Sequence, residues 1–421
     1  MRRRGTLRAN QQATLYANVA GYVTKVAVDN LAAVMRLAGA KNLDIQIAQQ
    51  RFVEAQAAHE QAVMQFFPYV SPGVAFKRHE GNAQTVDGQI IDTNKESFGA
   101  GVNVTAQLEL GETIYKAMIA KRLATDAQFA ADVQRQESVY QGVADFFELV
   151  RAKAARGVAV ESVRIADSYA GELGRAVEAG IAFKGDAFRA LAQAERNRLV
   201  LRQSEEQQRI AAARLAQTPH ISPMIELRPD GGEPAPLRLP EYRSTLNALV
   251  ADALAQRPEM KRSDAQLSAA RKARDGAKFG PLIPAVRGEY FHGGLGGGTY
   301  EDGVRRFDET SDYGVGLSWR VGSGGLFDRG RIHAGEARLQ TGELEQEKVR
   351  DEITRQVVEA HARAHSLADQ IEFFHKALSA AEQDLTRARL DYLTAITEHN
   401  RAQLALRRAV GNPARALKSG R

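Results

Sequence analysis

The stretch GVNVTAQLEL, residues 101–110, alternates apolar and polar residues along its whole length. Successive side chains of a β-strand point to opposite faces, so the alternation predicts a strand with one apolar and one polar face. The residues from Gly111 onward lack this alternation and favour one very long helix. The question is why a mostly helical chain has a strand that suits two different environments.

Composition excludes several classes of function. The 421 residues carry 57 basic and 51 acidic side chains spread through the chain, with a net charge of +6 and no cysteine. This mixture is typical of salt-bridged helices, so we expect no nucleic-acid partner. The lack of cysteine excludes disulfides, thiolate metal sites, a cysteine nucleophile and a lipidated N-terminal cysteine. No run reaches the ~18 apolar residues of a transmembrane helix, so any membrane crossing must use strands.

The first residues, MRRRGTLRANQQATLY, have a basic start without the apolar core of a secretory signal. We therefore expect either a cytoplasmic chain or an N-terminus that is truncated or fused. Residues 1–30 are expected to form an atypical segment of short strands, or to be disordered.

An internal duplication sets the expected architecture. FFPYVSPGVAFKRHEG (66–81) aligns with LIPAVRGEYFHGGLGG (282–297), and the segment 97–124 aligns with 311–339. Pro68 then corresponds to Pro284 and Gly101 to Gly316, with nearly the same offset. Matches that keep one spacing over so long a stretch indicate a tandem duplication.

Each repeat is expected to contain a helix, two strands joined by a polar loop, and a second long helix that is part of a coiled-coil-like pair. The expected segments are a first repeat at 31–217 (helix about 31–67, strands about 69–78 and 97–110, loop 79–96), a proline-rich linker at 218–242 with a short strand near Ile225–Leu227, a second repeat at 243–413 (helix about 244–279, strands about 285–291 and 313–321, loop 292–310), and a tail at 414–421. Residues that cannot continue a helix mark the helix-to-strand breaks: Pro68, Gly111, Pro281, Pro284, Gly322, Gly324 and Gly325.

The strands have an apolar and a polar face in both repeats. The predicted apolar, lipid-facing residues are Val102, Val104, Leu108, Leu110, Tyr313, Val315, Leu317 and Trp319. The predicted polar, lumen-facing residues are Asn103, Thr105, Gln107, Glu109, Ser318 and Arg320. A membrane barrel has this pattern, with about 9–11 residues per strand. A soluble antiparallel sheet with one buried face has it as well, and the period alone does not separate the two.

Closure of the sheet argues for an oligomer. Four strands are too few for a barrel, which needs about eight, and an open sheet leaves unpaired edges in lipid. Three chains supply twelve strands. The expected fold class is therefore mainly α with a transmembrane β part: long helical hairpins and four strands per chain, forming a trimeric 12-stranded barrel and a helical tunnel.

These features resemble the outer-membrane efflux protein family typified by TolC. The resemblance covers about residues 31–413 and depends on the duplicated plan together with FFPYVSPGVAF, GPLIPAVRGEYF, LELGETIYKAMIAKR, LSWRVGSGGLFDRGRIHAGEARL, VEAGIAFKGDAFRALAQAE (177–195) and DYLTAITEHNRAQLALRRAVG (391–411). It implies a homotrimeric exit duct in outer-membrane lipid, with a helical tunnel across the periplasm that meets an adaptor protein and an inner-membrane pump.

The hairpin tip is the predicted docking site for the adaptor. Two glycines interrupt otherwise continuous helices there, and two apolar residues lie at an exposed bend. The tip residues are Gly180, Ile181, Phe183, Lys184, Gly185 and Asp186. A plain helical hairpin turn is the alternative.

The chain departs from the family pattern in two places. Nothing between residues 370 and 400 resembles the first tip. The second repeat is therefore expected to have long helices with a shortened tip, and the chain to pass straight into the closing helix near Arg389–Asp391. The sequence therefore does not establish whether this chain gates the channel or docks the adaptor completely. The segment 5–30 instead resembles a piece of the periplasmic adaptor proteins, through AxVxGYVxKVxV-like alternation.

Other candidate sites are weaker. His361 and His365 have helical i, i+4 spacing, which zinc can use, but without a third ligand a solvated helix face is the preferred interpretation. The glycines of GGLGGGTY (293–300) precede no helix, so we expect a flexible loop. We predict no catalytic or metal site, no cofactor and no enzyme activity. The predicted function is an outer-membrane duct of a tripartite efflux or type I secretion system, and the alternative is a soluble coiled-coil scaffold with a capping sheet.

Overall fold

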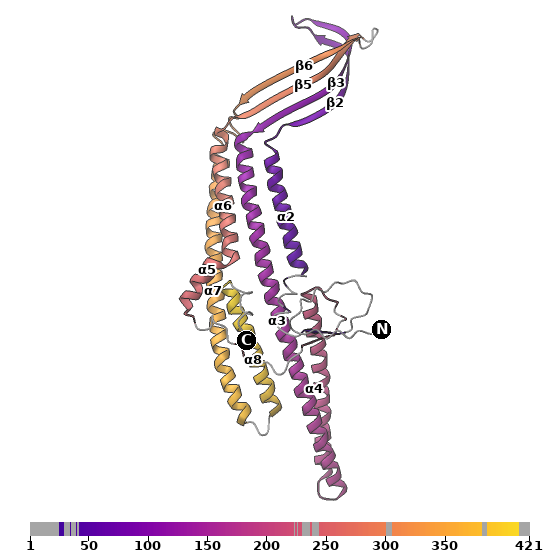
Figure 1. The fold of residues 1–421 in the computed structure, drawn as a ribbon, viewed down its shortest axis with the longest axis vertical. Coiled ribbons are helices and arrows are strands. Elements are labelled where there is room, and N and C mark those ends of the chain that lie inside the picture. Colours follow the sequence, from indigo (N-terminus) through magenta and orange to yellow (C-terminus); the bar gives the residue numbers. More distant parts are fainter. Residues whose placement is uncertain are drawn as a thin grey trace, which may run out of the picture. The chain divides into compact units, whose positions relative to one another are not determined.

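The computed structural model describes residues 25–28, 34, 39, 42–222, 224, 226–229, 236–237, 244–299, 305–380 and 385–411 (Figure 1). Its helices are α2 (Leu43–Met64), α3 (Leu110–Glu178), α4 (Lys184–Gln217), α5 (Leu246–Gln256), α6 (Pro258–Phe279), α7 (Arg329–Ala380) and α8 (Leu385–Ala409). Its strands are β1 (Lys25–Val28), β2 (Tyr69–Gln84), β3 (Ile90–Glu109), β4 (Glu226–Pro229), β5 (Ala285–Thr299) and β6 (Arg305–Ser318).

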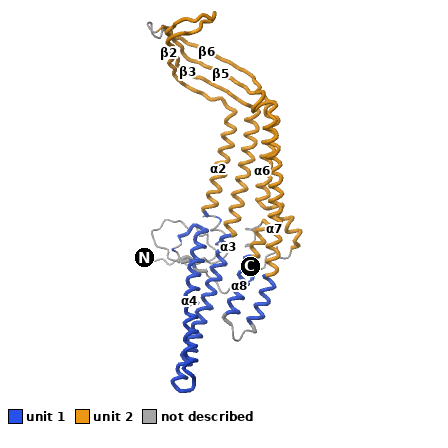
Figure 2. Tube along the Cα trace, turned by 180° about the vertical axis from the view of Figure 1, so that it is seen from behind, with its two compact units in different colours: residues 1–42, 141–237, 367–401 blue, residues 43–140, 238–366, 402–421 orange. Residues whose placement is uncertain are grey.

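The chain divides into two compact units (Figure 2). Unit 1 comprises residues 1–42, 141–237 and 367–401, and unit 2 comprises residues 43–140, 238–366 and 402–421. The boundary crosses α3, α7 and α8, so each of these helices contributes to both units. Among the described residues, no helix combines the length and the apolarity that a membrane span requires.

Unit 2 contains the four-stranded sheet, ordered β2-β3-β5-β6 with every pair antiparallel. The prediction of two strand pairs per chain is confirmed, and the structure joins the two pairs into one sheet through β3 and β5. β2 and β6 are the free edges. Pro72 lies in β2, where an edge position tolerates the missing N–H.

The strands are longer than predicted, and the predicted polar loops 79–96 and 292–310 are wrong over most of their length. β2 and β3 stay paired out to Gln84 and Ile90, and the glycine-rich residues 293–299 belong to β5. Cross-strand pairing satisfies the backbone of these residues whatever their side chains. Their glycine-rich and polar composition therefore does not predict where the strands end.

The first helix of the second repeat is interrupted, contrary to the predicted single helix at 244–279. α5 ends at Gln256, Arg257 is extended (φ −65°, ψ 133°), and Pro258 begins α6. Proline disfavours helical backbone in the residue before it, which accounts for the break. Arg257 is only 2% exposed and donates hydrogen bonds to Glu259 and to Gln356 of α7 (2.7 Å).

Unit 1 contains the hairpin of α3 and α4 and its core. The buried residues of this core come from both helices and from two neighbouring segments: Val34, Leu149, Ala152, Ala211, Leu215, Ala216 and Leu227. Leu227 belongs to β4, which pairs in parallel with β1. The segment before the first helix and the linker between repeats are thus joined, whereas residues 1–24 lie outside the described residues.

A second hairpin, shorter than the first, is present in unit 1, and its second helix begins before Arg389–Asp391, where the closing helix was expected. α7 ends at Ala380 and α8 begins at Leu385, so residues 389–391 lie inside a helix. The two helices run side by side in both views (Figures 1 and 2), and the ring centroids of His375 and Tyr392 are 5.9 Å apart. With no copy of the first tip in this segment, the sequence resemblance does not reveal the turn.

Replacing Leu227 with alanine tests whether β4 anchors the linker to the helices. Leu227 is 1% exposed, so the cavity left by Leu227→Ala should cost about 2–4 kcal/mol. We expect a clear decrease in the thermal unfolding midpoint of unit 1, followed by circular dichroism and limited proteolysis. Leu199→Ala, on a 59% exposed position of α4, is the matched control and should have little effect. Equal effects of the two substitutions would contradict the anchoring role.

Candidate functional site

The register of the sheet puts most apolar residues of the four strands on one face. Directly paired residues share a face, and Val70 pairs with Val104, Val104 with Tyr290, and Tyr290 with Tyr313. We call this the apolar face, and its members are Val70, Pro72, Val74, Phe76, Phe98, Ala100, Val102, Val104, Ala106, Leu108, Val286, Gly288, Tyr290, Tyr313, Val315 and Leu317.

The opposite face is polar or small at most positions, and its large apolar residues include Tyr69, Phe291 and Leu295. We call it the polar face, with Ser71, Gly73, Ala75, Lys77, Ser97, Gly99, Gly101, Asn103, Thr105, Gln107, Glu109, Arg287, Glu289, Asp312, Gly314, Gly316 and Ser318. Gly73, Gly101 and Gly293 form one row across three strands. A Cβ on Gly293 would lie 2.3 Å from the carbonyl oxygen of Ala100, so the strands approach closely on this side. Such glycines let a sheet curve.

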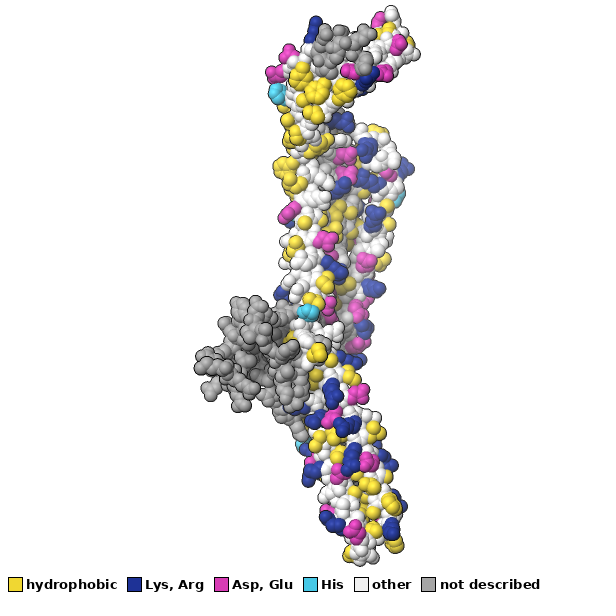
Figure 3. All heavy atoms as spheres, turned by 90° about the vertical axis from the view of Figure 1, so that its right-hand side faces the viewer, with side chains coloured by type: hydrophobic (Ala, Val, Ile, Leu, Met, Phe, Trp, Pro, Cys, Tyr) yellow, Lys and Arg dark blue, Asp and Glu magenta, His cyan; other side chains and the backbone are white. Residues whose placement is uncertain are grey.

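Within the described part of the chain, no helix covers either face of the sheet. Val74 is 76%, Tyr313 86% and Val315 84% exposed, and no residue of the four strands is among the buried hydrophobic residues of the described chain. Figure 3 shows hydrophobic side chains gathered on the sheet surface. An apolar surface this continuous is unusual for a protein region that faces water and indicates an apolar surrounding or a partner.

The apolar face has a polar margin on the side away from the helices. Beyond Phe76, Arg78 forms ion pairs with Glu80 and with Glu96 of β3 (3.6 Å). On the other two strands, His292 Nδ1 lies 2.9 Å from the hydroxyl of Ser311. On β3 the apolar positions run from Phe98 to Leu108, which matches the ~9–11 residues of a transmembrane strand.

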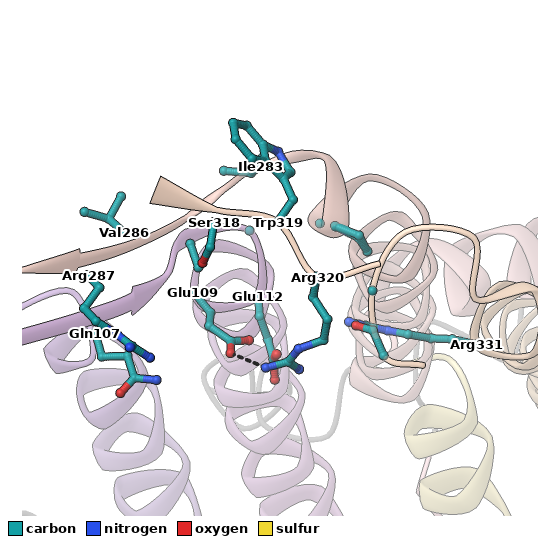
Figure 4. A pocket seen from close by; sticks show the side chains of 16 residues that line it. Gln107, Glu109, Glu112, Ile283, Val286, Arg287, Ser318, Trp319, Arg320 and Arg331 are labelled. Carbon is teal, nitrogen blue, oxygen red and sulfur yellow. Dashed lines mark hydrogen bonds and ion pairs between the residues drawn. The ribbon is translucent and has the colours of Figure 1, made fainter. Parts of the chain in front are cut away.

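A charged cluster lies where the strands meet the helices, around a cavity of about 340 Å³ (Figure 4). Arg320 forms an ion pair with Glu109 (2.8 Å), which joins the two repeats across 211 residues of sequence. Arg287 and Glu112 lie on the same side of the strand ends. Trp319 projects to the opposite side, and its indole N–H donates to the carbonyl oxygen of Leu282 (3.2 Å). Charged and aromatic side chains therefore separate at the strand ends.

Asp328 holds the turn between β6 and α7. Its two carboxylate oxygens accept the backbone N–H groups of Gly324 (2.8 Å) and Arg331 (2.9 Å), which caps the helix. These two hydrogen bonds, that of Arg331 first, hold the pKa of Asp328 below its ordinary value. Gly322 (φ 97°) and Gly324 (φ 74°) adopt left-handed backbone in the same turn, as their predicted role as breaks requires.

In the first repeat the same transition uses close packing instead of a turn. Leu110 is the first residue of α3, so its predicted position on the strand face is wrong, and Gly111 lies within the helix rather than before it. A Cβ on Gly111 would lie 2.0 Å from the carbonyl oxygen of Gly280, next to Pro281 of the 3₁₀ turn. The helix starts directly from the strand, so no glycine is needed to break it. Gly111 is needed because its backbone lies too close to Gly280 for a side chain to fit.

The α3–α4 tip has a well-defined helix end. The N–H of Ile181 donates to the carbonyl of Ala176 (2.8 Å) and that of Gly180 to Val177 (3.0 Å), with Gly180 at φ 75°. This is a Schellman cap, in which glycine is strongly preferred. Gly185 plays no such part: it lies in the first turn of α4 with open space around its Cα, so its predicted role as a break is wrong.

Apolar side chains are exposed at this tip. Ile181 is 82% exposed and Phe183 83%, and Phe188 in the following turn is 69% exposed. Asp186 forms an ion pair with Arg189, while Lys184 begins α4. A groove of about 540 Å³ lies between α3 and α4, lined by Ser162, Ile165, Tyr169, Asp186, Arg189 and Gln193.

The histidine pair lies on α7. The rings of His361 and His365 lie 4.3 Å apart, and burial, followed by the charge of His365, lowers the pKa of His361. No group of three or more histidine, aspartate or glutamate side chains in the described part of the chain has metal-binding geometry.

The predicted wall residues divide between the faces as follows. Val102, Val104, Leu108, Tyr313, Val315 and Leu317 lie on the apolar face, and Asn103, Thr105, Gln107, Glu109 and Ser318 on the polar face. Trp319 and Arg320 follow the last residue of β6, so their predicted place within a strand is wrong. Pro68 and Pro284 immediately precede β2 and β5. No local sequence signal indicates the Glu109–Arg320 pair, and the only such signal for the Asp328 cap is an acidic residue before a helix.

Replacing Gly111 with alanine tests the close approach of α3 to the 3₁₀ turn. We expect Gly111→Ala to lower the thermal stability of unit 2 strongly, because the new methyl group meets a backbone oxygen that cannot rotate away. Gly157→Ala in the same helix is the matched control, with no atom within 4 Å of the added Cβ. It should stabilise the helix by about 0.5–1 kcal/mol. Unfolding midpoints that move in the same direction would contradict this account.

The Asp328 cap predicts a pH-dependent contribution to stability. Because the pKa is lower in the folded state than in the unfolded chain, the contribution is complete above about pH 4–5 and is lost as the pH falls through the lowered pKa. The thermal midpoint of Asp328→Asn should therefore be lower than that of the unsubstituted protein at pH 7, and the difference should shrink at pH 3. Asp351→Asn, an exposed acidic residue of α7, is the control. A difference that stays constant with pH would rule out the capping role.

Solved structures share this fold over almost the whole chain. CusC, whose structures concern folding and transmembrane channel formation, has 16% identity and a TM-score of 0.75, covering 98% of this chain and 99% of its own. The outer membrane protein VceC from Vibrio cholerae has 16% identity and a TM-score of 0.73, covering 91% and 97%. The open state of the MtrE outer membrane channel from Neisseria gonorrhoeae has 14% identity and a TM-score of 0.69, covering 91% and 89%.

Comparisons of the sequence found no matching family model and no matching curated protein. Identities this low carry the fold alone. The chain has the fold of TolC-like outer-membrane channels.

Proposed function

We propose that the chain is one subunit of a homotrimeric channel in the outer membrane of a Gram-negative bacterium. It would act as a passive exit duct for an efflux pump or a type I secretion system. The observation that carries the proposal is the sheet with one continuous apolar face, one polar face and two free edges. The structures of similar fold include outer-membrane channels, which supports the same conclusion.

The apolar face is the proposed lipid contact. In hydrocarbon, every backbone N–H and C=O of a strand needs a partner, so an open four-stranded sheet cannot be stable there alone. Pairing β6 of one copy with β2 of the next satisfies both edges except at Pro72, which has no N–H to donate, and three copies give twelve strands in a closed ring. The polar face, with its glycine row, then lines a water-filled lumen.

Substrate passage along this lumen needs no chemistry from the chain. The polar face offers small and charged side chains without a catalytic grouping, so the energy for transport would come from an inner-membrane pump. The exposed tip residues Ile181 and Phe183 are the proposed contact for a periplasmic adaptor, because they are apolar and follow a hydrogen-bonded helix cap.

Two adjacent residues of β6 provide a matched test of the membrane assignment. Val315 is on the apolar face and Gly316 on the polar face, and neither position has tight neighbours: Val315 is 84% exposed and a Cβ on Gly316 meets nothing within 4 Å. Val315→Arg places a charge in lipid, at a cost of up to about 2–4 kcal/mol per subunit. We expect it to reduce the trimer recovered from outer-membrane fractions.

Gly316→Arg should assemble normally and instead change conduction. In planar lipid bilayers, the purified Gly316→Arg trimer should show lower single-channel conductance and weaker cation passage than the unsubstituted channel. The alternative of a soluble scaffold with a capping sheet predicts a different result: a protein that stays in solution without detergent, tolerates Val315→Arg and forms no pores. That result would refute the channel assignment.

A further inference from the structure

We infer the register in which β6 of one copy pairs with β2 of the next: Tyr313 opposite Phe76, and Asp312 opposite Lys77. The inference deepens the proposed function, because it depends on the copies joining edge to edge. It names the residues that would meet at the interface, which is formed by a second copy of this chain.

The direction of the free N–H groups limits the possible registers. Pro72 has no N–H, so its pair with Val102 cannot be a hydrogen-bonded one, and the N–H groups of Val70 and Val74 point to the free edge. Alternation across the three ladders makes the N–H groups of Tyr313 and Val315 point to the other free edge. Residues of the apolar face therefore pair with each other between copies, which permits only registers that differ by steps of two residues.

The ends of the apolar face select among these registers. Phe76 is the last apolar residue of its face before Arg78 on β2. On β6, Tyr313 is the last before the polar residues Ser311 and Glu309, beyond which Phe307 packs against Phe98 of β3. Pairing Phe76 with Tyr313 makes the polar margins of both strands meet at one level and gives an aromatic cross-strand pair. A register shifted by two residues in one direction places Phe76 opposite Ser311, and one shifted in the other direction places Tyr313 opposite Arg78. Each shifted register pairs an aromatic residue with a polar one.

Charge on the polar face favours the same register. Lys77 and Asp312 are both exposed, and neither has an ion-pair partner among the residues that the structure describes. In the inferred register these opposite charges are directly paired between copies. Glu80 would face Glu309 beyond the polar margin, where Arg78 is already paired with Glu80 and water screens the charges.

The resulting strand tilt agrees with that of known barrels. The row of paired residues runs through Val70, Val104, Tyr290 and Tyr313 of one copy and reaches Phe76 of the next copy. Between one β2 strand and the next, the row therefore shifts along β2 from position 70 to position 76. That shift is roughly 20 Å along the strand for roughly 19 Å around the wall, a tilt of about 45°. Transmembrane barrels have tilts of about 35–45°.

Disulfide cross-linking tests the register directly, because the chain contains no cysteine of its own. Ala75 and Gly314 are opposite each other in the inferred register, and added side chains fit: a Cβ on Gly314 has its nearest neighbour at 3.6 Å. Full-length Ala75→Cys/Gly314→Cys protein in outer-membrane fractions should form covalent dimers and trimers on mild oxidation, seen on non-reducing denaturing gels. The slipped pairs Ala75→Cys/Asp312→Cys and Ala75→Cys/Gly316→Cys, and each single cysteine, should remain monomeric.

The outcomes separate the register from the channel. Preferential cross-linking of a slipped pair overturns the register and leaves edge-to-edge assembly intact. Failure of all three pairs, in variants that still fractionate with the outer membrane and conduct, overturns the β6–β2 contact itself. Failure together with loss of membrane fractionation and conduction overturns the proposed function.

A charge exchange gives a second measurement. Lys77→Glu or Asp312→Lys alone should lower the temperature at which trimers dissociate in detergent, and Lys77→Glu/Asp312→Lys together should restore it. The pair Lys95→Glu and Asp312→Lys is the control, because Lys95 lies on β3 away from the edge and should not compensate. Equal midpoints for the double exchange and the single variants would contradict the Lys77–Asp312 contact.

Discussion

The structure depends on one constraint: the strands alternate with a period of two, and their registers keep the alternation in phase. Val70, Val104, Tyr290 and Tyr313 share one row and one face only because each ladder is paired at the right residue. A slip of a single residue at any ladder would put the apolar residues of the strands on its two sides on opposite faces. The single sheet therefore has one mainly apolar and one mainly polar surface. No helix in the described part of the chain covers either surface.

The constraint extends to the places where strands become helices. β3 continues into α3 without a loop, so the backbone must approach the 3₁₀ turn closely, which Gly111 allows. The equivalent step after β6 contains a turn with two left-handed glycines, closed by Asp328. The Glu109–Arg320 pair ties the two steps together. Duplicated segments have thus solved the same geometric problem with different chemistry.

The sequence predicted the duplicated plan and the two faces because alternation and repetition are local signals. It failed at the strand ends, since the glycine and polar residues at 79–84 and 293–299 have no alternation and acquire their strand structure from their partners. It failed also at Leu110, where apolar alternation continues into the first turn of a helix. The break at Pro258 had a local signal, the proline itself, which the prediction of one helix did not use.

The two repeats are alike where they must be and differ elsewhere. In the sheet, strands of the two repeats pair directly through β3 and β5, so their faces and lengths have to agree. No such pairing links the helical hairpins, and there the repeats have diverged: α3 has 69 residues and α4 34, whereas α7 has 52 and α8 25. The Schellman cap and its exposed apolar residues belong to the first hairpin. In the proposed trimer, the barrel would have nearly sixfold symmetry, whereas the helical hairpins would have only threefold symmetry. A partner that recognises the first type of hairpin tip would then find three equivalent binding sites.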